Sequence, residues 1–301
     1  MSHPEVTASS TQPVPKVIEL PGAPPFREWH IECPIHGPQT VRTYMRNGLF
    51  GEPKCYICQR EEGEKMARSE AIKGEALATT IALQNFFGPS IGGDDSSACF
   101  TFDRFKTSGF QHVEKAKTLC ERFADRFVIR AEERELARAS GDLGWRKKNS
   151  IGIFLRGPCG VGKTFLALSI LNRLAQLSVP GYFVSCPSLM TAVLDLPFGE
   201  KSTAIRLLCR ASVLVLDDVG AQAWKPSEQQ LLFQIVDGRI SRGLPIIATS
   251  NLIGKQLEEC LTTRTAQRLL ASTVSIDAAS WPNWRMARHK SLTLETFVEG
   301  F

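Results

Sequence analysis

Residues 157–164 read GPCGVGKT, with three glycines, a lysine and a threonine in eight residues. Its spacing, G-x-x-x-x-G-K-T, is typical of a phosphate-binding P-loop. The apolar run IGIFL at 151–155 precedes it, and the helical pattern FLALSILNRLAQL at 165–177 follows it. Strand, glycine-rich loop and helix in this order predict backbone N–H groups that surround phosphate oxygens at a helix N-terminus.

We expect the loop to hold a nucleotide. Lys163 would reach the β- and γ-phosphates, and Thr164 would offer its hydroxyl to Mg²⁺. The expected nucleotide-binding residues are Gly157, Pro158, Cys159, Gly160, Val161, Gly162, Lys163, Thr164 and Asp217. The motif therefore predicts ATP and Mg²⁺ as cofactors.

Two further apolar runs end in polar side chains. VLVLDDVG at 213–220 predicts a buried strand that ends at Asp217, a candidate Mg²⁺ residue; Asp218 would orient or deprotonate the attacking water. PIIATSN at 245–251 predicts a strand followed by Asn251, which would position the same water. Ligands of open parallel sheets bind at the carboxyl ends of strands, so these side chains should meet the P-loop.

The part of the chain after residue 98 alternates apolar strand patterns with helical patterns. The expected strands are residues 151–155, 181–185, 212–216, 245–249 and 273–276. This alternation predicts an α/β fold with a mostly parallel, five-stranded sheet covered on both faces. A chain of 301 residues that is 43% hydrophobic is long enough for this core and for a smaller module.

Cysteines cluster near the front of the chain. CPIHG at 33–37 and CYIC at 55–58 supply two closely spaced ligand pairs. Cys33, His36, Cys55 and Cys58 would form a closed Cys₃His site, which suits structural Zn²⁺. His30 is close enough in sequence to be an alternative ligand. About thirty residues bury little core, so metal ligation would supply most of the folding energy.

Changes in amino-acid composition along the chain predict its domain boundaries. The expected organisation is a flexible lead-in at 1–26, a zinc module plus helix at 27–87, a linker at 88–98 and the ATPase domain at 99–301. The helical composition covers 61–87, with interruptions expected at Gly63 and Gly74.

Charge and hydropathy narrow the possible partners and location. Residues 1–98 carry 9 Lys/Arg and 12 Asp/Glu, whereas residues 99–301 carry 27 and 19, so the second part permits a nucleic-acid partner. No apolar stretch approaches the ~20 residues of a membrane span. Nine cysteines, mostly isolated in apolar segments, indicate a reducing compartment, and we expect a cytoplasmic location without a membrane partner.

Several motifs occur together in a specific order. They are CFTFDRFKTSG at 99–109, GPCGVGKT, LVLDDVG, ATSN, TTRTAQRLLAS at 262–272 and NWR at 283–285. In this combination the chain resembles the DnaC/IstB-like branch of AAA+ ATPases, the helicase loaders and transposition helpers. Loaders often have Asp-Glu where this chain has Asp217-Asp218, so the resemblance leaves room for slow ATP hydrolysis that depends on assembly or DNA.

The resemblance implies roles for three arginines. Arg268 matches the arginine finger, which reaches the ATP of a neighbouring subunit in a self-assembled spiral. Arg264 is the alternative finger, although a salt bridge suits it better. Arg285 matches a sensor-2-like arginine. With Lys163, Asp218 and Asn251, the residues Arg268 and Arg285 complete the expected catalytic set.

The resemblance also implies partners. In loaders the segment N-terminal to the ATPase domain binds a DnaB-like replicative hexameric helicase. Single-stranded DNA passes through the inside of the spiral that the ATPase subunits form. The insertion at 188–210 would contact DNA through Lys201, Ser202, Thr203 and Arg206. The stretch 281–290 would either stack on bases or pack against the core. The acidic balance of 1–98 argues against DNA binding by the zinc module.

Four functions are compatible with a chain that carries a P-loop. An ATP-dependent helicase loader is the leading hypothesis, because transposition helpers usually begin with a helical segment and not with a zinc module. An IstB-like transposition helper is the alternative. A DNA-binding adaptor that ATP switches with little hydrolysis is a third. A small-molecule P-loop kinase would need neither Asn251, Arg268 nor the zinc module.

Overall fold

The computed structural model describes residues 14–47, 49–89, 99–129, 133, 140, 141 and 151–286. The chain divides into two compact units, Met1–Ile72 and Lys73–Phe301. The division falls within helix α1 (Tyr56–Phe87), whereas the sequence placed the boundary at 88–98. Residues 90–98 lie outside the described residues.

The position of this boundary has a packing cause. The buried residues of α1 are Thr79, Thr80 and Leu83, all in its C-terminal part. Just beyond the helix, the Gly88 carbonyl accepts a hydrogen bond of 3.0 Å from the Tyr182 hydroxyl. The end of α1 therefore belongs to the core of the second unit.

The first unit is a small antiparallel sheet with strand order β1-β2-β3-β4. Its strands are β1 (Val17–Ile18), β2 (Phe26–Cys33), β3 (Gly37–Arg46) and β4 (Leu49–Phe50). A tight turn joins Cys33 to Gly37, which pair across the hairpin. Gly37 adopts φ +71°, a conformation that glycine reaches without steric cost. The flexible lead-in expected at 1–26 overlaps β1 and the first residue of β2, and residues 1–13 are outside the described part.

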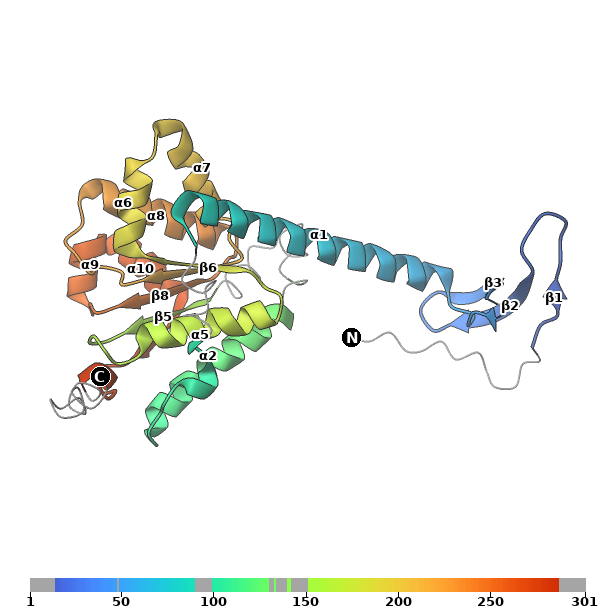
Figure 1. The fold of residues 1–301 in the computed structure, drawn as a ribbon, viewed down its shortest axis with the longest axis horizontal. Helices are drawn as coiled ribbons and strands as arrows, with labels where there is room; N and C mark the ends of the chain where they lie inside the picture. The colour runs from blue at the N-terminus through green and yellow to red at the C-terminus, as the bar shows by residue number, and fades with distance from the viewer. Residues whose placement is uncertain are drawn as a thin grey trace, which may run out of the picture. The chain divides into compact units, whose positions relative to one another are not determined.

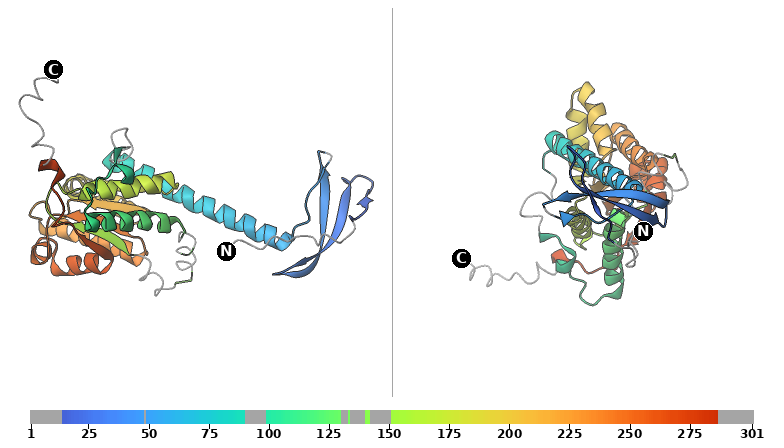
Figure 2. Two further views of the ribbon diagram at one scale, coloured as in Figure 1. Left: turned by 90° about the horizontal axis from the view of Figure 1, so that it is seen from below. Right: turned by 90° about the vertical axis from the view of Figure 1, so that its right-hand side faces the viewer.

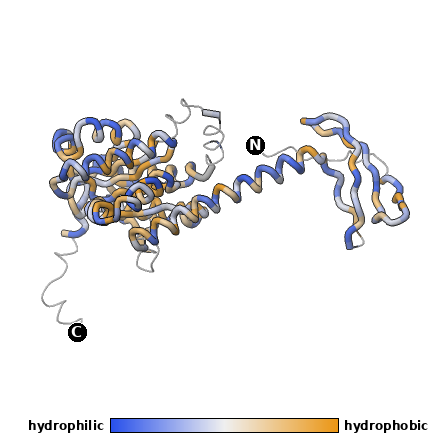
Figure 3. Tube along the Cα trace, turned by 90° about the horizontal axis from the view of Figure 1, so that it is seen from above, coloured by the Kyte–Doolittle hydropathy of each residue, from blue (hydrophilic) through white to orange (hydrophobic). Residues whose placement is uncertain are grey.

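Helix α1 differs from its expected form. It begins at Tyr56, directly after Cys55, and runs without interruption through Gly63 and Gly74. Much of its length is hydrophilic (Figure 3). The earlier start places Cys58 in the first turn of the helix. The low helix propensity of glycine predicted breaks in α1 at Gly63 and Gly74. The helix has none, because tertiary contacts at its C-terminal end stabilise it by more than the two glycines destabilise it.

The second unit contains a five-stranded sheet whose paired strands are all parallel, with strand order β6-β7-β8-β5-β9. Its strands are β5 (Gly152–Arg156), β6 (Gly181–Ser185), β7 (Val213–Asp217), β8 (Ile246–Ser250) and β9 (Thr273–Asp277). These are the five expected strands, shifted by at most one residue at each end. The expected α/β fold with a parallel sheet is confirmed.

Helices cover both faces of this sheet (Figures 1 and 2). They are α2 (Gln111–Ile129), α5 (Lys163–Gln176), α6 (Cys186–Asp195), α7 (Phe198–Leu208), α8 (Pro226–Ser241), α9 (Lys255–Leu261) and α10 (Thr263–Ala271), with a short 3₁₀ turn, η2 (Phe102–Arg104), before α2. On β5, Ile153 and Leu155 pack with α2 and α5, whereas Phe154 packs with α6, α8, α9 and α10. Alternate residues of β5, β6, β7 and β8 thus serve two cores, because side chains in a strand point to opposite faces.

Strand register places the functional motifs at one edge of the sheet. Arg156 of β5 pairs with Ser250 of β8, and Ser185 of β6 pairs with Asp217 of β7. The P-loop, Asp217 and Asn251 each follow or end one of three adjacent strands. They therefore emerge side by side, as the parallel sheet predicted.

A buried arginine holds the opposite side of the second unit together. Arg239 of α8 is fully buried and donates hydrogen bonds of 2.7 Å to the carbonyls of Leu208, Ala211 and Pro245. These carbonyls belong to the end of α7 and to the segments leading into β7 and β8. Burial lowers the pKa of Arg239 to about 9.

Replacing Arg239 with Met should destabilise the second unit. The change leaves three buried carbonyls without donors, so the free energy of unfolding should fall by about 3 kcal/mol or more. Arg173→Met is the matched control, since Arg173 pairs with Asp125 at an exposed site and should contribute less than about 1 kcal/mol. Urea denaturation measures both, and equal midpoints for the two variants would contradict the assignment.

Candidate functional site

The P-loop curls because its glycines allow left-handed backbone. Gly162 is the N-cap of α5 with φ +97°, and an added Cβ would lie 2.8 Å from a ring atom of Phe105. No other residue fits there without displacing that ring. The backbone N–H groups of the loop thus lie at the N-terminus of a buried helix, which is an anion-binding arrangement.

Lys163 connects the P-loop to the neighbouring strand. Its ammonium donates hydrogen bonds to the carbonyls of Gly157 (2.9 Å) and Pro158 (2.8 Å) and to Asn251 Oδ1 (2.8 Å). The side chain is 5% exposed, and burial lowers the pKa of Lys163, although Cys159, Asp218 and Asp217 oppose this shift. The structure therefore brings Lys163 and Asn251, expected to act on one phosphate, into direct contact.

Thr164 and Asp217 form an oxygen-rich pair beside the loop. Thr164 Oγ1 donates to the Asp217 carboxylate at 3.0 Å. Burial raises the pKa of Asp217, while hydrogen bonds from Thr249 and Thr164 lower it. A hydroxyl and a buried carboxylate are the oxygen donors that Mg²⁺ prefers, so the two residues fit the cation that nucleotide binding requires.

These groups line a cavity of about 1080 Å³. Its lining residues are Phe100, Arg104, Phe105, Lys106, Ser108, Cys159, Gly160, Gly162, Lys163, Thr164, Phe165, Asp217, Asp218, Asn251, Trp284 and Arg285. Four of the five expected catalytic residues thus meet in one place. Sequence reasoning missed Arg104, Lys106, Ser108 and Trp284, although the segments that carry them had been recognised as part of the family pattern.

The C-terminal segment reaches the cavity by bonding to the P-loop. Asn283 Nδ2 donates to the Cys159 carbonyl at 3.0 Å, and the Trp284 backbone N–H donates to the Gly160 carbonyl at 2.9 Å. These bonds carry Arg285 to the cavity wall. Trp281 is buried in the core, so for this residue packing, and not base stacking, is confirmed; residues 287–290 lie outside the described part.

Arg268 does not line the cavity of its own chain. It lies on α10, pairs with Asp237 of α8 and contacts the face of the Phe233 ring. Arg264 lies 4.6 Å from the centre of the same ring. The salt bridge expected for Arg264 is absent among the described residues, because an aromatic ring and not a carboxylate faces its guanidinium.

The expected DNA-contacting residues lie on α7. Ser202 and Arg206 are exposed one helical turn apart, and the Arg206 guanidinium donates to Thr203 Oγ1 at 3.0 Å. Lys201 is partly exposed. Sequence reasoning missed Phe198 at the start of the helix, whose side chain is 93% exposed. An exposed aromatic next to basic and hydroxyl side chains is suited to a nucleic-acid strand.

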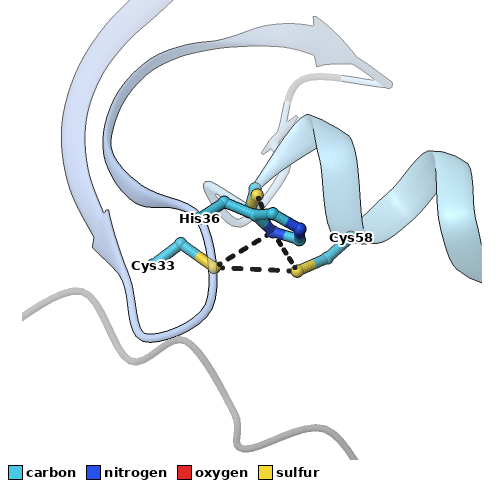
Figure 4. A group of neighbouring side chains, drawn as sticks. Cys33, His36 and Cys58 are labelled. Atoms are coloured by element: carbon cyan, nitrogen blue, oxygen red, sulfur yellow. Dashed lines mark hydrogen bonds between the residues drawn. The ribbon is translucent and has the colours of Figure 1, made fainter.

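The cysteine cluster of the first unit has the geometry of a metal site (Figure 4). The ligand atoms of Cys33, His36, Cys55 and Cys58 all lie within 4.8 Å of one another. Cys33 Sγ is 3.7 Å from Cys58 Sγ, and His36 Nδ1 is 3.3–3.6 Å from the three sulfurs. A tetrahedral zinc ion would separate two sulfurs by about 3.8 Å and sulfur from nitrogen by about 3.5 Å. The four residues therefore fit zinc.

The surroundings of the cluster favour the thiolate form of Cys33 but not of Cys58, where burial and the neighbouring thiols of Cys33 and Cys55 raise the pKa to about 12. Burial raises the pKa of Cys33, but hydrogen bonds from the backbone N–H groups of Ile35 and His36 outweigh it and lower the pKa to about 6. Glu61 Oε1 lies 3.5 Å from His36 Nε2, on the ring side away from the sulfurs. A carboxylate there would fix the tautomer that leaves Nδ1 free for metal.

His30, the alternative ligand, is not part of the cluster. Its Nδ1 lies 3.0 Å from Thr40 Oγ1 on the exposed face of the hairpin. The side chain of His36, at the turn, is the one that reaches the three sulfurs. The strand register explains the choice, because His30 pairs with Thr40 well before the turn.

Comparisons with known proteins identify the second unit. A family model described as IstB-like ATP binding protein matches residues 110–275. A putative ATP-binding protein of insertion sequence IS5376 from Geobacillus stearothermophilus is 32% identical over 107 residues, 35% of this chain and 41% of that protein. The replicative helicase loader DnaI of Bacillus subtilis is 30% identical over 118 residues, 37% and 36% of the two chains.

Among solved structures, the DnaC helicase loader has a TM-score of 0.50 and 18% identity, covering 61% of this chain and 99% of that chain. This similarity shows the fold. The matched stretches span less than half the length of the two curated relatives. The metal cluster lies outside the family match.

None of the helices that the structure describes is both long enough and apolar enough to cross a membrane.

Protein purified without chelator should contain one zinc ion per chain. Cys55→Ser removes one of four ligands, so the zinc content should fall well below one ion per chain, while nucleotide binding by the second unit should be retained. Cys99→Ser, an exposed cysteine outside the cluster, is the control and should keep its zinc. Metal analysis that finds no zinc in the unaltered protein would refute the assignment.

Proposed function

Because the chain belongs to the IstB-like ATP binding protein family, we propose that it is an ATPase that loads a replicative hexameric helicase onto single-stranded DNA. The observation that carries the ATPase assignment is the convergence of Lys163, Asp217, Asp218, Asn251 and Arg285 on one cavity. The helicase-loading assignment is supported by the similarity to DnaI and by a separate Cys/His unit ahead of the ATPase.

Each side chain has a defined task in hydrolysis. Lys163 and the P-loop N–H groups bind the β- and γ-phosphates, and Thr164 with Asp217 hold Mg²⁺, which neutralises phosphate charge. Asp218 orients or deprotonates the attacking water. Asn251 positions that water from the adjacent strand, and Arg285 lies on the cavity wall where it would face phosphate.

The first unit supplies the partner-binding role in this proposal. Among the described residues, its hydrophobic cluster consists of buried Ile31, Cys33 and Cys55 with a few partly buried neighbours, so two of the three buried members are candidate metal ligands. If metal ligation stabilises the unit, the side chains of its strands need not be buried and can contact a helicase. Tyr44 and Leu49 are among the apolar residues exposed there.

A transposition helper is the second candidate, because the family model and the relative from Geobacillus stearothermophilus are associated with insertion sequences. A pull-down decides between the two. Full-length protein should capture a hexameric replicative helicase in the presence of ATP, and Cys55→Ser should lose this capture while keeping ATPase activity. Capture of a transposase and not of a helicase would favour the second candidate.

Two substitutions separate phosphate binding from hydrolysis. Lys163→Ala should abolish nucleotide binding, because Lys163 is the one cationic side chain in the P-loop sequence GPCGVGKT. Asp218→Asn should bind ATP normally and lose turnover by a factor on the order of 10² or more, because the amide cannot take a proton. Binding of a fluorescent ATP analogue and phosphate release measure the two steps. Equal turnover by wild type and Asp218→Asn would show that Asp218 has another role.

The third test concerns Arg268. If it acts on a neighbouring subunit, Arg268→Ala should bind ATP normally and lose turnover in assemblies by a factor on the order of 10³. Mixing it with Lys163→Ala should restore part of the activity, since about a quarter of head-to-tail interfaces then pair an intact P-loop with an intact arginine. The measurement is ATPase rate against mixing ratio, with single-stranded DNA present.

Asp237→Ala is the control that the structure provides, because Asp237 is the partner of Arg268 within the chain. A finger keeps its function without that partner, so Asp237→Ala should retain turnover. If Asp237→Ala lost as much activity as Arg268→Ala, the arginine would serve the packing of α8 and α10 and not a neighbouring ATP.

A further inference from the structure

The turn after β7 holds its second carboxylate in an unusual backbone conformation. Asp217 is the last residue of β7, and Asp218 adopts φ +55°. A residue with a Cβ is sterically disfavoured in this left-handed region. The surrounding structure must therefore hold Asp218 in place, and the contacts of the turn show what does so.

A single hydroxyl on the adjacent strand bonds to both residues. Thr249 of β8 is fully buried, and its Oγ1 donates to Asp217 Oδ1 at 2.6 Å. The same oxygen accepts the backbone N–H of Asp218 at 2.9 Å. A hydroxyl has one proton and two lone pairs, so the donation to the carboxylate leaves a lone pair for the N–H. Both bonds can form together only with this polarity.

The bonds that follow extend the same connection. The Thr249 carbonyl accepts the Val219 N–H at 2.8 Å, and Ser250 Oγ donates to the Val219 carbonyl at 2.6 Å. Strand β8 thus holds each successive residue of the turn. Among these contacts, only the Thr249 hydroxyl reaches the carboxylate that faces Thr164.

Thr249 itself does not line the cavity, so any effect on hydrolysis passes through Asp217 and Asp218. Its bond to Oδ1 orients the carboxylate that would hold Mg²⁺. Its bond to the Asp218 N–H holds the backbone from which the second carboxylate projects into the cavity. The rotation of one carboxylate and the backbone position of the other are therefore linked through one oxygen atom.

We propose that Thr249 is a positioning residue for hydrolysis, whose hydroxyl sets the Asp217 carboxylate for Mg²⁺ and the Asp218 side chain for water in a single arrangement. The proposal rests on the nucleotide chemistry proposed above, and adds a residue that never touches the nucleotide. It predicts that removing the hydroxyl separates nucleotide binding, which uses the P-loop, from the Mg²⁺ response and turnover, which use the two carboxylates.

The test compares Thr249→Val, which keeps the shape and removes the hydroxyl, with Thr249→Ser, which keeps the hydroxyl. Binding of a fluorescent ADP analogue to the full chain is measured in EDTA and across a Mg²⁺ titration, together with ATP turnover. Thr249→Val should bind in EDTA as wild type does, need about tenfold more Mg²⁺ for half-maximal response and lose turnover by about tenfold or more. Thr249→Ser should restore most of both.

Thr79→Val is the matched control, because Thr79 is also a buried threonine whose hydroxyl donates a hydrogen bond, in this case to the Glu75 carbonyl of α1. It should match wild type in the Mg²⁺ titration. A wild-type Mg²⁺ response in Thr249→Val would overturn the proposal. So would a Thr249→Ser variant as impaired as Thr249→Val, since the methyl group and not the hydroxyl would then matter.

The Mg²⁺ titration also keeps the two proposals apart. If the wild type binds nucleotide with Mg²⁺ but shows no turnover, the ATPase assignment and the role of Thr249 in positioning Asp218 for water both fail, while the comparison of Val with Ser at position 249 still decides whether the hydroxyl sets Asp217 for Mg²⁺. If the wild type shows no Mg²⁺-dependent nucleotide binding, both proposals are overturned.

Discussion

The pairing of three parallel strands, β7, β8 and β5, is the constraint on which the rest of the second unit depends. Arg156 lies opposite Ser250, so the P-loop after β5 and Asn251 after β8 leave the sheet at the same level. A shift of one residue in this register would turn every side chain of a strand to the other face and move Lys163 away from Asn251. Two cores, one on each side of the sheet, hold that register.

Burial gives the charged groups at this edge their chemistry. Lys163 and Asp217 are both nearly removed from water. Burial favours the neutral form of each side chain, so it lowers the pKa of Lys163 and raises the pKa of Asp217. Hydrogen bonds from Thr249 and Thr164 and the mutual attraction of the opposite charges counter this shift. A phosphate group and a cation entering such a site meet fixed dipoles in place of water, which is how a preorganised site stabilises developing charge.

The first unit differs from the second in the size of its apolar core. Its hairpin and the start of α1 are too small to bury a stabilising apolar core, and two of the three fully packed residues of its cluster are ligand cysteines. The tight turn at Gly37 and the first turn of α1 bring two ligand pairs together from separate elements. In the proposed zinc site, metal ligation would take the place of hydrophobic packing in this unit.

The sequence alone determined the five strands, the P-loop, the Asp217–Asp218 pair and the ligands Cys33, His36, Cys55 and Cys58 as candidates, because each depends on local spacing. Apolar runs of about five residues must be buried, and only glycine tolerates the backbone of the loop. Local spacing, however, left His30 as a rival ligand and predicted breaks at Gly63 and Gly74 that the helix does not have.

Tertiary structure decided what depends on distant partners. Strand pairing excluded His30, packing of Leu83 made the end of α1 part of the second unit, and Phe233 took the place of a carboxylate beside Arg264. The role of Thr249 was equally invisible in the sequence, where it is one polar residue in a strand. Its two bonds reach residues more than thirty positions away, and only the parallel register of β7 and β8 brings them within 3 Å of its hydroxyl.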